Sequence, residues 1–162
     1  MYNYQKDLVE KAVKSVIEKE FAGEKMTLKL ALALIDKIEQ KAASWNMRIV
    51  SAVSDASGNP VAVHCMDGAY IGSYDVAVNK TYTSIAFQMP TKELGKLSQP
   101  GKELYGIQFT NGGRVVIFGG GEPLKRNGTI IGALGVSGGT AEQDTKLAEY
   151  GVSVFEEVIK CL

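Results

Sequence analysis

The sequence has a single histidine, His64, among its 162 residues. A metal centre built from several histidines of one chain is therefore excluded, unless subunits share the site. Cysteine is also scarce, and Cys65 and Cys161 form neither a C-x-x-C pair nor the spacing of a zinc site. We interpret both as buried or half-buried free thiols, because the other features of the sequence indicate a reducing cytosol, where structural disulfides are rare.

An excess of charge of one sign is also missing. The 18 basic and 18 acidic residues cancel, and the sequence pI is about 6.6. Since this balance does not attract a polyanion, we expect no nucleic-acid partner. No apolar run approaches the length of a transmembrane helix, and residues 1–7 lack the basic region and apolar core of a signal peptide. We therefore expect no membrane partner and a cytoplasmic location.

The apolar content, 45% of the chain, is enough for one domain with a single core. Residues 3–21 place apolar side chains at helical spacing, with Lys and Glu on the opposite face. Gly23 ends this pattern. We expect residues 1–25 to form an N-terminal amphipathic helix extension and residues 26–162 to form the main domain.

The remaining pattern predicts an α+β domain. Two helices precede a hairpin, a third helix follows it, and three more strands lead into the last helix. Because hairpins dominate, we expect a sheet of about five antiparallel strands with helices on both faces. The expected helices lie at 27–46, 73–89 and 140–162, with a short one at 92–97, and the expected strands at 49–53, 60–66, 114–118, 124–126 and 129–136.

The glycine-punctuated run 129–144 predicts a strand, a tight turn and the start of the last helix. Thr140 is the expected N-cap, and Gln143 completes a capping box. Free N–H groups of Gly138, Gly139 and Thr140 could hold an anion at this helix start. The alternative is a plain connection from a core strand to a helix.

Part of this run, Gly135-Val-Ser-Gly-Gly139, matches the G-x-S-x-G pattern of a hydrolase nucleophile. In α/β-hydrolases the triad histidine follows the serine, whereas His64 lies far before Ser137. Ser137 therefore has no evident general base, and we assign no catalytic residue.

Several spaced motifs occur together in this sequence. They are Met66-Asp-Gly-Ala69, Gly72-Ser73, Lys80-Thr-Tyr-Thr83, Met89-Pro-Thr91, Gly119-Gly-Gly121 and Gly132-Ala-Leu-Gly-Val-Ser-Gly-Gly139 followed by Gln143-Asp144. Over roughly residues 26–160 the chain resembles the GlcG/HbpS-like haem-binding family, which includes the C-terminal domain of PduO-type proteins. The resemblance implies a profilin-like α/β/α sandwich, a homo-oligomer and association with haem or a corrinoid. It also implies a setting near glycolate, diol or ethanolamine pathways, with a bacterial microcompartment as the alternative location to the open cytoplasm.

His64 is the candidate ligand of a haem iron, because imidazole is a common axial ligand. Strand alternation places His64 and Met66 on one face and Cys65 on the other, apolar face. Asp67 follows in the loop that we expect to form the rim of a cleft. The alternatives are a histidine that is only hydrogen-bonded within the structure, and a thiolate ligand from Cys65.

Two residues of the third helix, Lys80 and Thr83, are three positions apart and could face one cleft. We expect them, or the helix start at 138–140, to lie near a ligand carboxylate such as a haem propionate. The alternative is that Asp67, Lys80 and Asp144 form only caps and surface ion pairs.

The sequence thus favours a protein that binds a small ligand, haem or a related tetrapyrrole, as an accessory to a metabolic operon. One alternative is an enzyme or enzyme accessory acting on a small organic acid, aldehyde or diol. Another is a structural or docking oligomer of a microcompartment or a corrinoid-enzyme system.

Overall fold

The structure is a computed structural model that describes Asp7, residues 9–13 and residues 25–162. Asp7 and residues 9–13 are helical and exposed. The rest of the helix predicted over 3–21 lies outside the described residues.

Four strands form one antiparallel sheet in the order β2-β1-β4-β3. The strands are β1 (Val50–Asp55), β2 (Pro60–Cys65), β3 (Gly121–Arg126) and β4 (Thr129–Ser137). The helices are α2 (Leu28–Ser44), α3 (Ser73–Phe87), α4 (Thr91–Leu97) and α5 (Ala141–Lys160), with short 3-10 turns at Ile107–Phe109 and Asn111–Gly113. The α+β class and the antiparallel hairpins are therefore confirmed, and β2 and β3 are the edge strands.

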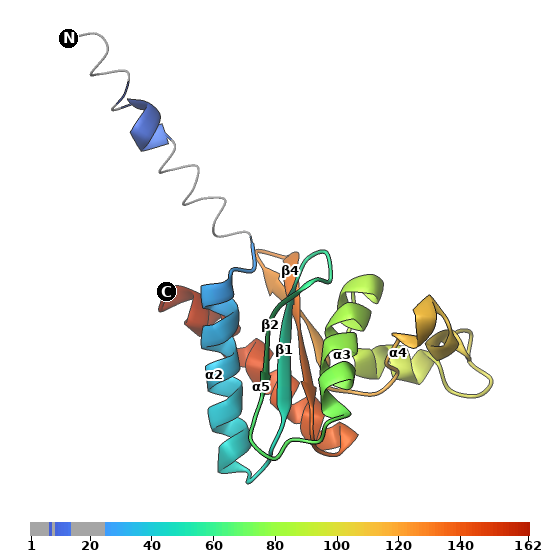
Figure 1. Ribbon diagram of the computed structural model, residues 1–162. Helices are drawn as coiled ribbons and strands as arrows, with labels where there is room; N and C mark the ends of the chain where they lie inside the picture. The colour runs from blue at the N-terminus through green and yellow to red at the C-terminus, as the bar shows by residue number, and fades with distance from the viewer. Residues whose placement is uncertain (1–6, 8, 14–24) are drawn as a thin grey trace.

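The prediction of about five strands was wrong by one strand, the one expected at 114–118. Residues 115–117 have no regular structure although Val115 and Val116 are buried. The N–H of Val116 donates to Thr83 Oγ at 2.9 Å, so a side chain of α3 takes the place of a neighbouring strand. Before this point the segment that follows α4 loops out beside the sheet beyond α3, and it then returns to the start of β3 (Figure 1).

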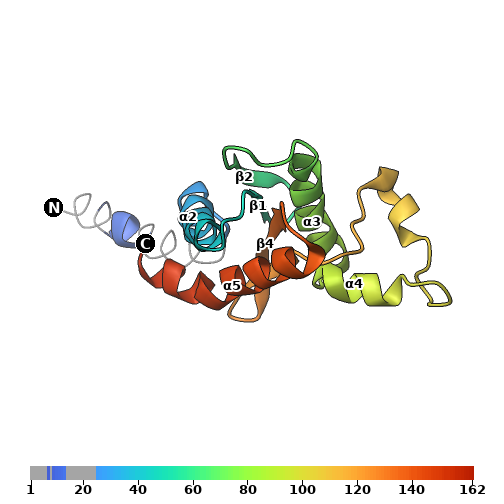
Figure 2. The same ribbon diagram turned by 90° about the horizontal axis from the view of Figure 1, so that it is seen from below.

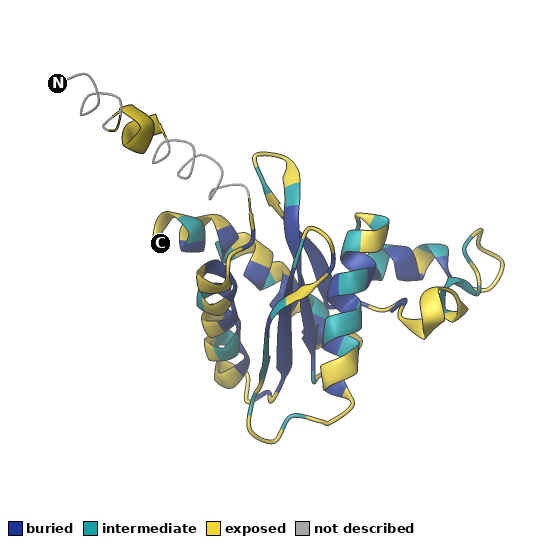
Figure 3. Cartoon of the chain, turned by 45° about the horizontal axis from the view of Figure 1, so that its top comes forward, coloured by how far each residue is buried: buried dark blue, intermediate teal, exposed yellow. Residues whose placement is uncertain are grey.

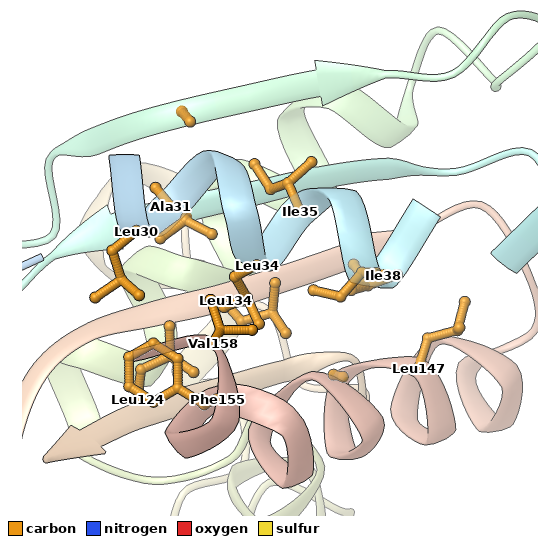
Figure 4. Packing of buried hydrophobic residues seen from close by; sticks show 14 of the residues in the cluster. Leu30, Ala31, Leu34, Ile35, Ile38, Leu124, Leu134, Leu147, Phe155 and Val158 are labelled. Carbon is orange, nitrogen blue, oxygen red and sulfur yellow. The ribbon is translucent and has the colours of Figure 1, made fainter. Parts of the chain in front are cut away.

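Helices cover both faces of the sheet, as predicted. Helices α2 and α5 lie against one face and α3 lies against the other (Figures 1 and 2). Burial follows this layering, because β1 and β4 are mostly dark blue in Figure 3, the edge strand β2 is mostly teal and yellow, and α2 is buried only on its inward side. Side chains of α2, β4 and α5, among them Leu34, Ile38, Leu134 and Phe155, interlock in the main core (Figure 4).

Two glycines allow the sheet to be packed closely. A Cβ at Gly135 of β4 would collide with the carbonyl oxygen of Ala77 in α3, so this helix can approach the strand only over a bare backbone. A Cβ at Gly132 would collide with the carbonyl oxygen of Ser54 in β1. Close backbone approach thus accounts for Gly132 and Gly135 in the run 129–144.

Candidate functional site

An open cleft of about 610 Å³ lies at the C-terminal end of edge strand β2. Residues from α2, from the turn before β1, from β2 and from the loop after β2 line it: Glu39, Arg48, Val63, His64, Cys65, Met66 and Asp67. The topology explains this mixture, because β2 has only β1 as a sheet neighbour and α2 packs over both strands. The structure therefore brings together three of the predicted site residues, His64, Met66 and Asp67.

Strand alternation along β2 has the predicted sense. Ala62 and Met66 pack into the core beneath α2, whereas Val63 packs against the cluster beneath α3. His64 shares the α2 face. Cys65 lies on the other face as predicted, but it is exposed, and so is Cys161. The prediction of buried or half-buried thiols was wrong, because β2 is an edge strand and Cys161 follows the last helical residue of α5.

The His64 imidazole is held by a carboxylate from another element. Its Nδ1 atom lies 3.2 Å from Glu39 Oε1, and the two side chains are 41% and 25% exposed. An ionised carboxylate can only accept a hydrogen bond, so Nδ1 carries the proton. Within the part of the chain that the structure describes, Glu39 is the one hydrogen-bonding partner of this ring, which in the neutral imidazole leaves Nε2 as a free electron-pair donor.

Arg48 joins this cleft to a second hollow. The second hollow, of about 280 Å³, extends to the start of α5 and is lined by Asn46, Met47, Arg48, Gly68, Tyr70, Gly138, Gly139 and Gln143. Arg48 is exposed, and the one hydrogen bond of its guanidinium within the described residues runs from Nη1 to the Met47 carbonyl oxygen at 3.4 Å. Sequence reasoning missed both Glu39 and Arg48, since neither lies in a recognised motif. The available signal was a basic residue just before β1, whose first residue, Val50, pairs with Cys65 at the end of β2.

A third hollow is apolar and shares Cys65 with the first and Tyr70 with the second. Its volume is about 370 Å³, and Val50, Cys65, Ala69, Tyr70, Ile71 and Tyr74 line it. Tyr70 and Ile71 are 74% and 96% exposed. Large apolar side chains of this exposure in one short loop indicate a surface that contacts an apolar ligand or partner.

At the start of α5, backbone N–H groups are hydrogen-bonded to side chains of the same helix. The capping box between Thr140 and Gln143 is present as predicted. The N–H of Gly139 donates to Asp144 Oδ1 at 2.9 Å and that of Thr140 to Gln143 Oε1 at 2.9 Å. The expectation that these two N–H groups are free was therefore wrong. Gly138 has a positive φ of +153°.

Lys80 and Thr83 do not line the cleft at His64. The Lys80 ammonium is fully buried and donates to Asp144 Oδ2 at 2.8 Å and to the Val136 carbonyl oxygen at 2.6 Å. Burial lowers the pKa of Lys80, while the charge and hydrogen bond of Asp144 oppose that shift. The surface ion pair expected as an alternative is therefore a buried one that ties α3 to β4 and α5. Thr83 is also buried. That it lies near a ligand carboxylate stays a prediction.

Ser137 has a hydroxyl neighbour where a hydrolase needs a base. Its Oγ atom lies 3.1 Å from Ser73 Oγ, and both side chains are buried.

Among the described residues no helix is long and apolar enough to cross a membrane. In the same part of the chain no three His, Cys, Asp or Glu side chains gather as a metal site.

Residues 26–153 match the family described as haem degrading protein HbpS-like. An uncharacterized 15.0 kDa protein from the dhaT-dhaS intergenic region of Citrobacter freundii is 44% identical over 133 residues, which are 82% of this chain and 94% of that protein. The corrinoid adenosyltransferase PduO of Salmonella typhimurium is 37% identical over 116 residues, 72% of this chain. The matched region spans only 34% of the length of that adenosyltransferase.

Solved structures have the same fold. The Klebsiella pneumoniae protein ORFY superposes with a TM-score of 0.79 at 40% identity, covering 81% of this chain and 90% of that one. The complex of PduOC with haem superposes with a TM-score of 0.77 at 33% identity, covering 80% of this chain and 94% of the PduOC chain. HbpS superposes with a TM-score of 0.71 at 25% identity, covering 80% of this chain and 89% of the HbpS chain.

Proposed function

The chain belongs to the HbpS-like family, and from this premise we propose that it binds haem or a related tetrapyrrole in the cleft at the end of β2, with His64 as axial ligand. One observation carries the proposal. The only imidazole of the sequence stands on an open cleft with its Nδ1 atom bonded to Glu39 and its Nε2 atom without a partner in the described chain. The structure of PduOC with haem supports the choice of ligand.

The residues around His64 fit such a ligand. A tetrapyrrole is a flat apolar plate, and the neighbouring loop offers Tyr70 and Ile71 as exposed apolar surface beside the cleft. Met66, half-buried beside the cleft, is a further soft side chain on the same face as His64. When bound, haem would supply an iron centre for one-electron chemistry or for binding a small molecule.

Arg48 is the group that we propose for the ligand's carboxylates. It is the basic side chain of the cleft and has a fork of donors suited to a carboxylate. Lys80, Thr83 and the helix start at 138–140 were predicted for this role. Of these, only the helix start adjoins Arg48, across the second hollow, and Asp144 and Gln143 already take two of its donors.

We propose an accessory role in a metabolic operon of the diol, glycolate or ethanolamine type. The position of a relative between dhaT and dhaS supports this setting. The match to a region of two corrinoid adenosyltransferases makes a corrinoid the second tetrapyrrole to test. The adenosyl transfer of those longer proteins forms no part of the proposal.

Titration of the full chain with haemin, followed at the Soret band, tests the proposed function, and cobalamin under the same conditions tests the second ligand. We expect saturable haemin binding. We expect His64→Ala to weaken it by about tenfold or more and to shift the Soret maximum, because the axial bond is lost. Cys65→Ser is the matched control, because Cys65 lines the same cleft from the opposite face of β2.

A His64→Ala protein with unchanged affinity and spectrum would contradict ligation by His64. A wild-type protein that binds neither tetrapyrrole would contradict the proposed function. It would favour the alternatives of a metabolite-binding enzyme accessory or a docking oligomer.

A further inference from the structure

Glu39 stands at the edge of the buried stripe of α2. Ile35 and Ile38 of this helix are fully buried in the core, and Glu39 is the half-buried residue that follows them on the side of β2. Residues 35 and 39 are one helical turn apart, so the packing of Ile35 fixes the position from which Glu39 extends. The carboxylate is therefore anchored by the core and not by a mobile loop.

The approach of Glu39 to His64 joins elements that are 25 residues apart in the sequence. Of the other charged side chains that line the cleft, Arg48 can only donate, and Asp67 follows β2 in an exposed loop. Within the described chain, neither makes a hydrogen bond with the imidazole. The state of the ring is thus set by one acceptor.

We propose that Glu39 is a positioning residue that holds His64 in the Nδ1–H tautomer and presents Nε2 to the ligand. This inference rests on the proposed function for the identity of the ligand, but the tautomer itself is a property of the chain alone. The proton on Nδ1 satisfies the carboxylate, which leaves the Nε2 electron pair available to a metal. A carboxylate bonded to the far nitrogen also orients the ring and makes it a more basic ligand.

The tautomer can be measured without any ligand. Because His64 is the only histidine, labelling with 15N-histidine marks one residue of the full-length protein. In two-bond 1H–15N correlation spectra of the protein without haem at pH 8, we expect Nδ1 to be protonated and Nε2 to be unprotonated. Glu39→Ala should produce a substantial population of the Nε2–H form, because the acceptor that selects the tautomer is gone.

Asp36→Ala is the matched control, since Asp36 is an exposed acid on the same helix one turn before Glu39. It should leave the tautomer of His64 unchanged. A wild-type protein with Nε2–H predominant, or a Glu39→Ala protein with the wild-type tautomer, would overturn the proposal.

A second measurement uses haemin. Glu39→Ala should weaken haemin affinity by about tenfold or more and raise the reduction potential of the bound haem, whereas Asp36→Ala should change neither. Unchanged affinity and potential in Glu39→Ala would overturn the positioning role. If the wild type bound no haemin but showed the Nδ1–H tautomer that Glu39→Ala loses, the role of Glu39 in the tautomer would hold and the proposed function would fail.

Discussion

Gly120 has a backbone conformation and surroundings that exclude a side chain. Its φ is +107°, and a Cβ there would lie 2.7 Å from Lys80 Nζ and 2.7 Å from the Val136 carbonyl oxygen. We expect Gly120→Ala to lower the free energy of unfolding by about 3 kcal/mol, because strain and overpacking add at this site. Urea denaturation measures the change.

Gly112→Ala separates these two causes. Gly112 also has a positive φ, +65°, but nothing lies within 4 Å of a Cβ built there. This variant should lose only about 1 kcal/mol, from the backbone alone. Equal losses in the two variants would contradict the packing of Gly120 against the buried Lys80.

Glu122 makes the stability depend on pH. It is buried on β3, and burial, together with the charges of Glu149 and Glu93 and against that of Lys92, raises its pKa from 4.5 to about 7. The folded state therefore holds this proton more tightly than the unfolded state. Its contribution to stability is fully present below pH 4.5 and is lost as the pH rises through about 7.

Between pH 5 and pH 8 we expect the free energy of unfolding to fall by up to about 3 kcal/mol on account of this group. Glu122→Gln should remove that slope, because the amide does not titrate, and should be the more stable protein at pH 8. Urea denaturation of both proteins at pH 5 and pH 8 measures the change in the free energy of unfolding. A slope that is unchanged in Glu122→Gln would assign the effect to another group.

The sequence alone predicted the face on which His64 lies, because alternation along a strand is a local rule. It did not predict the surroundings of Lys80. The partner of that ammonium is Asp144, 64 residues later, and only the packing of α3 across β4 brings the two together. Glu39 was missed for the same reason, since no local pattern links a helix residue to an edge strand.

The start of α5 is the best-defined local element. Thr140 Oγ accepts from Gln143 N at 3.2 Å, and the Gln143 side chain accepts from Thr140 N at 2.9 Å. We expect Thr140→Ala to cost about 1 kcal/mol of stability, because a helix N–H loses its acceptor. Thermal or urea denaturation measures the loss.

Ser153→Ala is the control for this prediction, because Ser153 is an exposed hydroxyl within the same helix that bonds only the Tyr150 carbonyl oxygen. Its removal should change the stability by less than about 0.5 kcal/mol. A Thr140→Ala protein as stable as Ser153→Ala would show that the cap does not stabilise the fold.

At the level of elements, the helices and hairpins were predictable from periodicity, caps and turn residues. The strand expected at 114–118 is not formed. An apolar run predicts burial, but it does not determine whether the backbone pairs with another strand. Val116 is buried as the pattern requires, but its N–H bonds the Thr83 hydroxyl. The same pattern missed the true start of β3 at Gly121, inside a run of glycines that indicates a turn.

For the whole molecule, we predict a homo-oligomer of at least two chains. In the described part of the N-terminal extension, Val9 and Val13 are four residues apart and are 61% and 50% exposed. An apolar stripe on an extension requires a partner, and a second copy related by symmetry can supply it. Light scattering should give at least twice the chain mass of 17.4 kDa.

A double change, Val9→Asp with Val13→Asp, should lower the measured mass if this stripe forms the contact. The matched change of Asp7 and Lys11 to Ser should not, since both side chains are exposed and pair with each other. A wild-type mass of about 17.4 kDa at micromolar concentration would contradict the prediction.

The cleft itself is a product of the topology of the whole chain. Glu39, Arg48 and His64 come from a helix, a turn and an edge strand, and the order β2-β1-β4-β3 leaves the end of β2 open beside α2. The sequence predicted one of these three residues. The others became visible only when the helix was placed over the edge of the sheet.

The most direct test of the central claim is electron–nuclear double resonance on the ferric haem complex of protein labelled with 15N-histidine. The label marks His64 alone, because the sequence has one histidine. We predict a 15N hyperfine coupling of an axially bound nitrogen, present in wild type and in Cys65→Ser and absent when unlabelled protein is used. A complex that retains its haem and shows no 15N coupling would contradict ligation through His64.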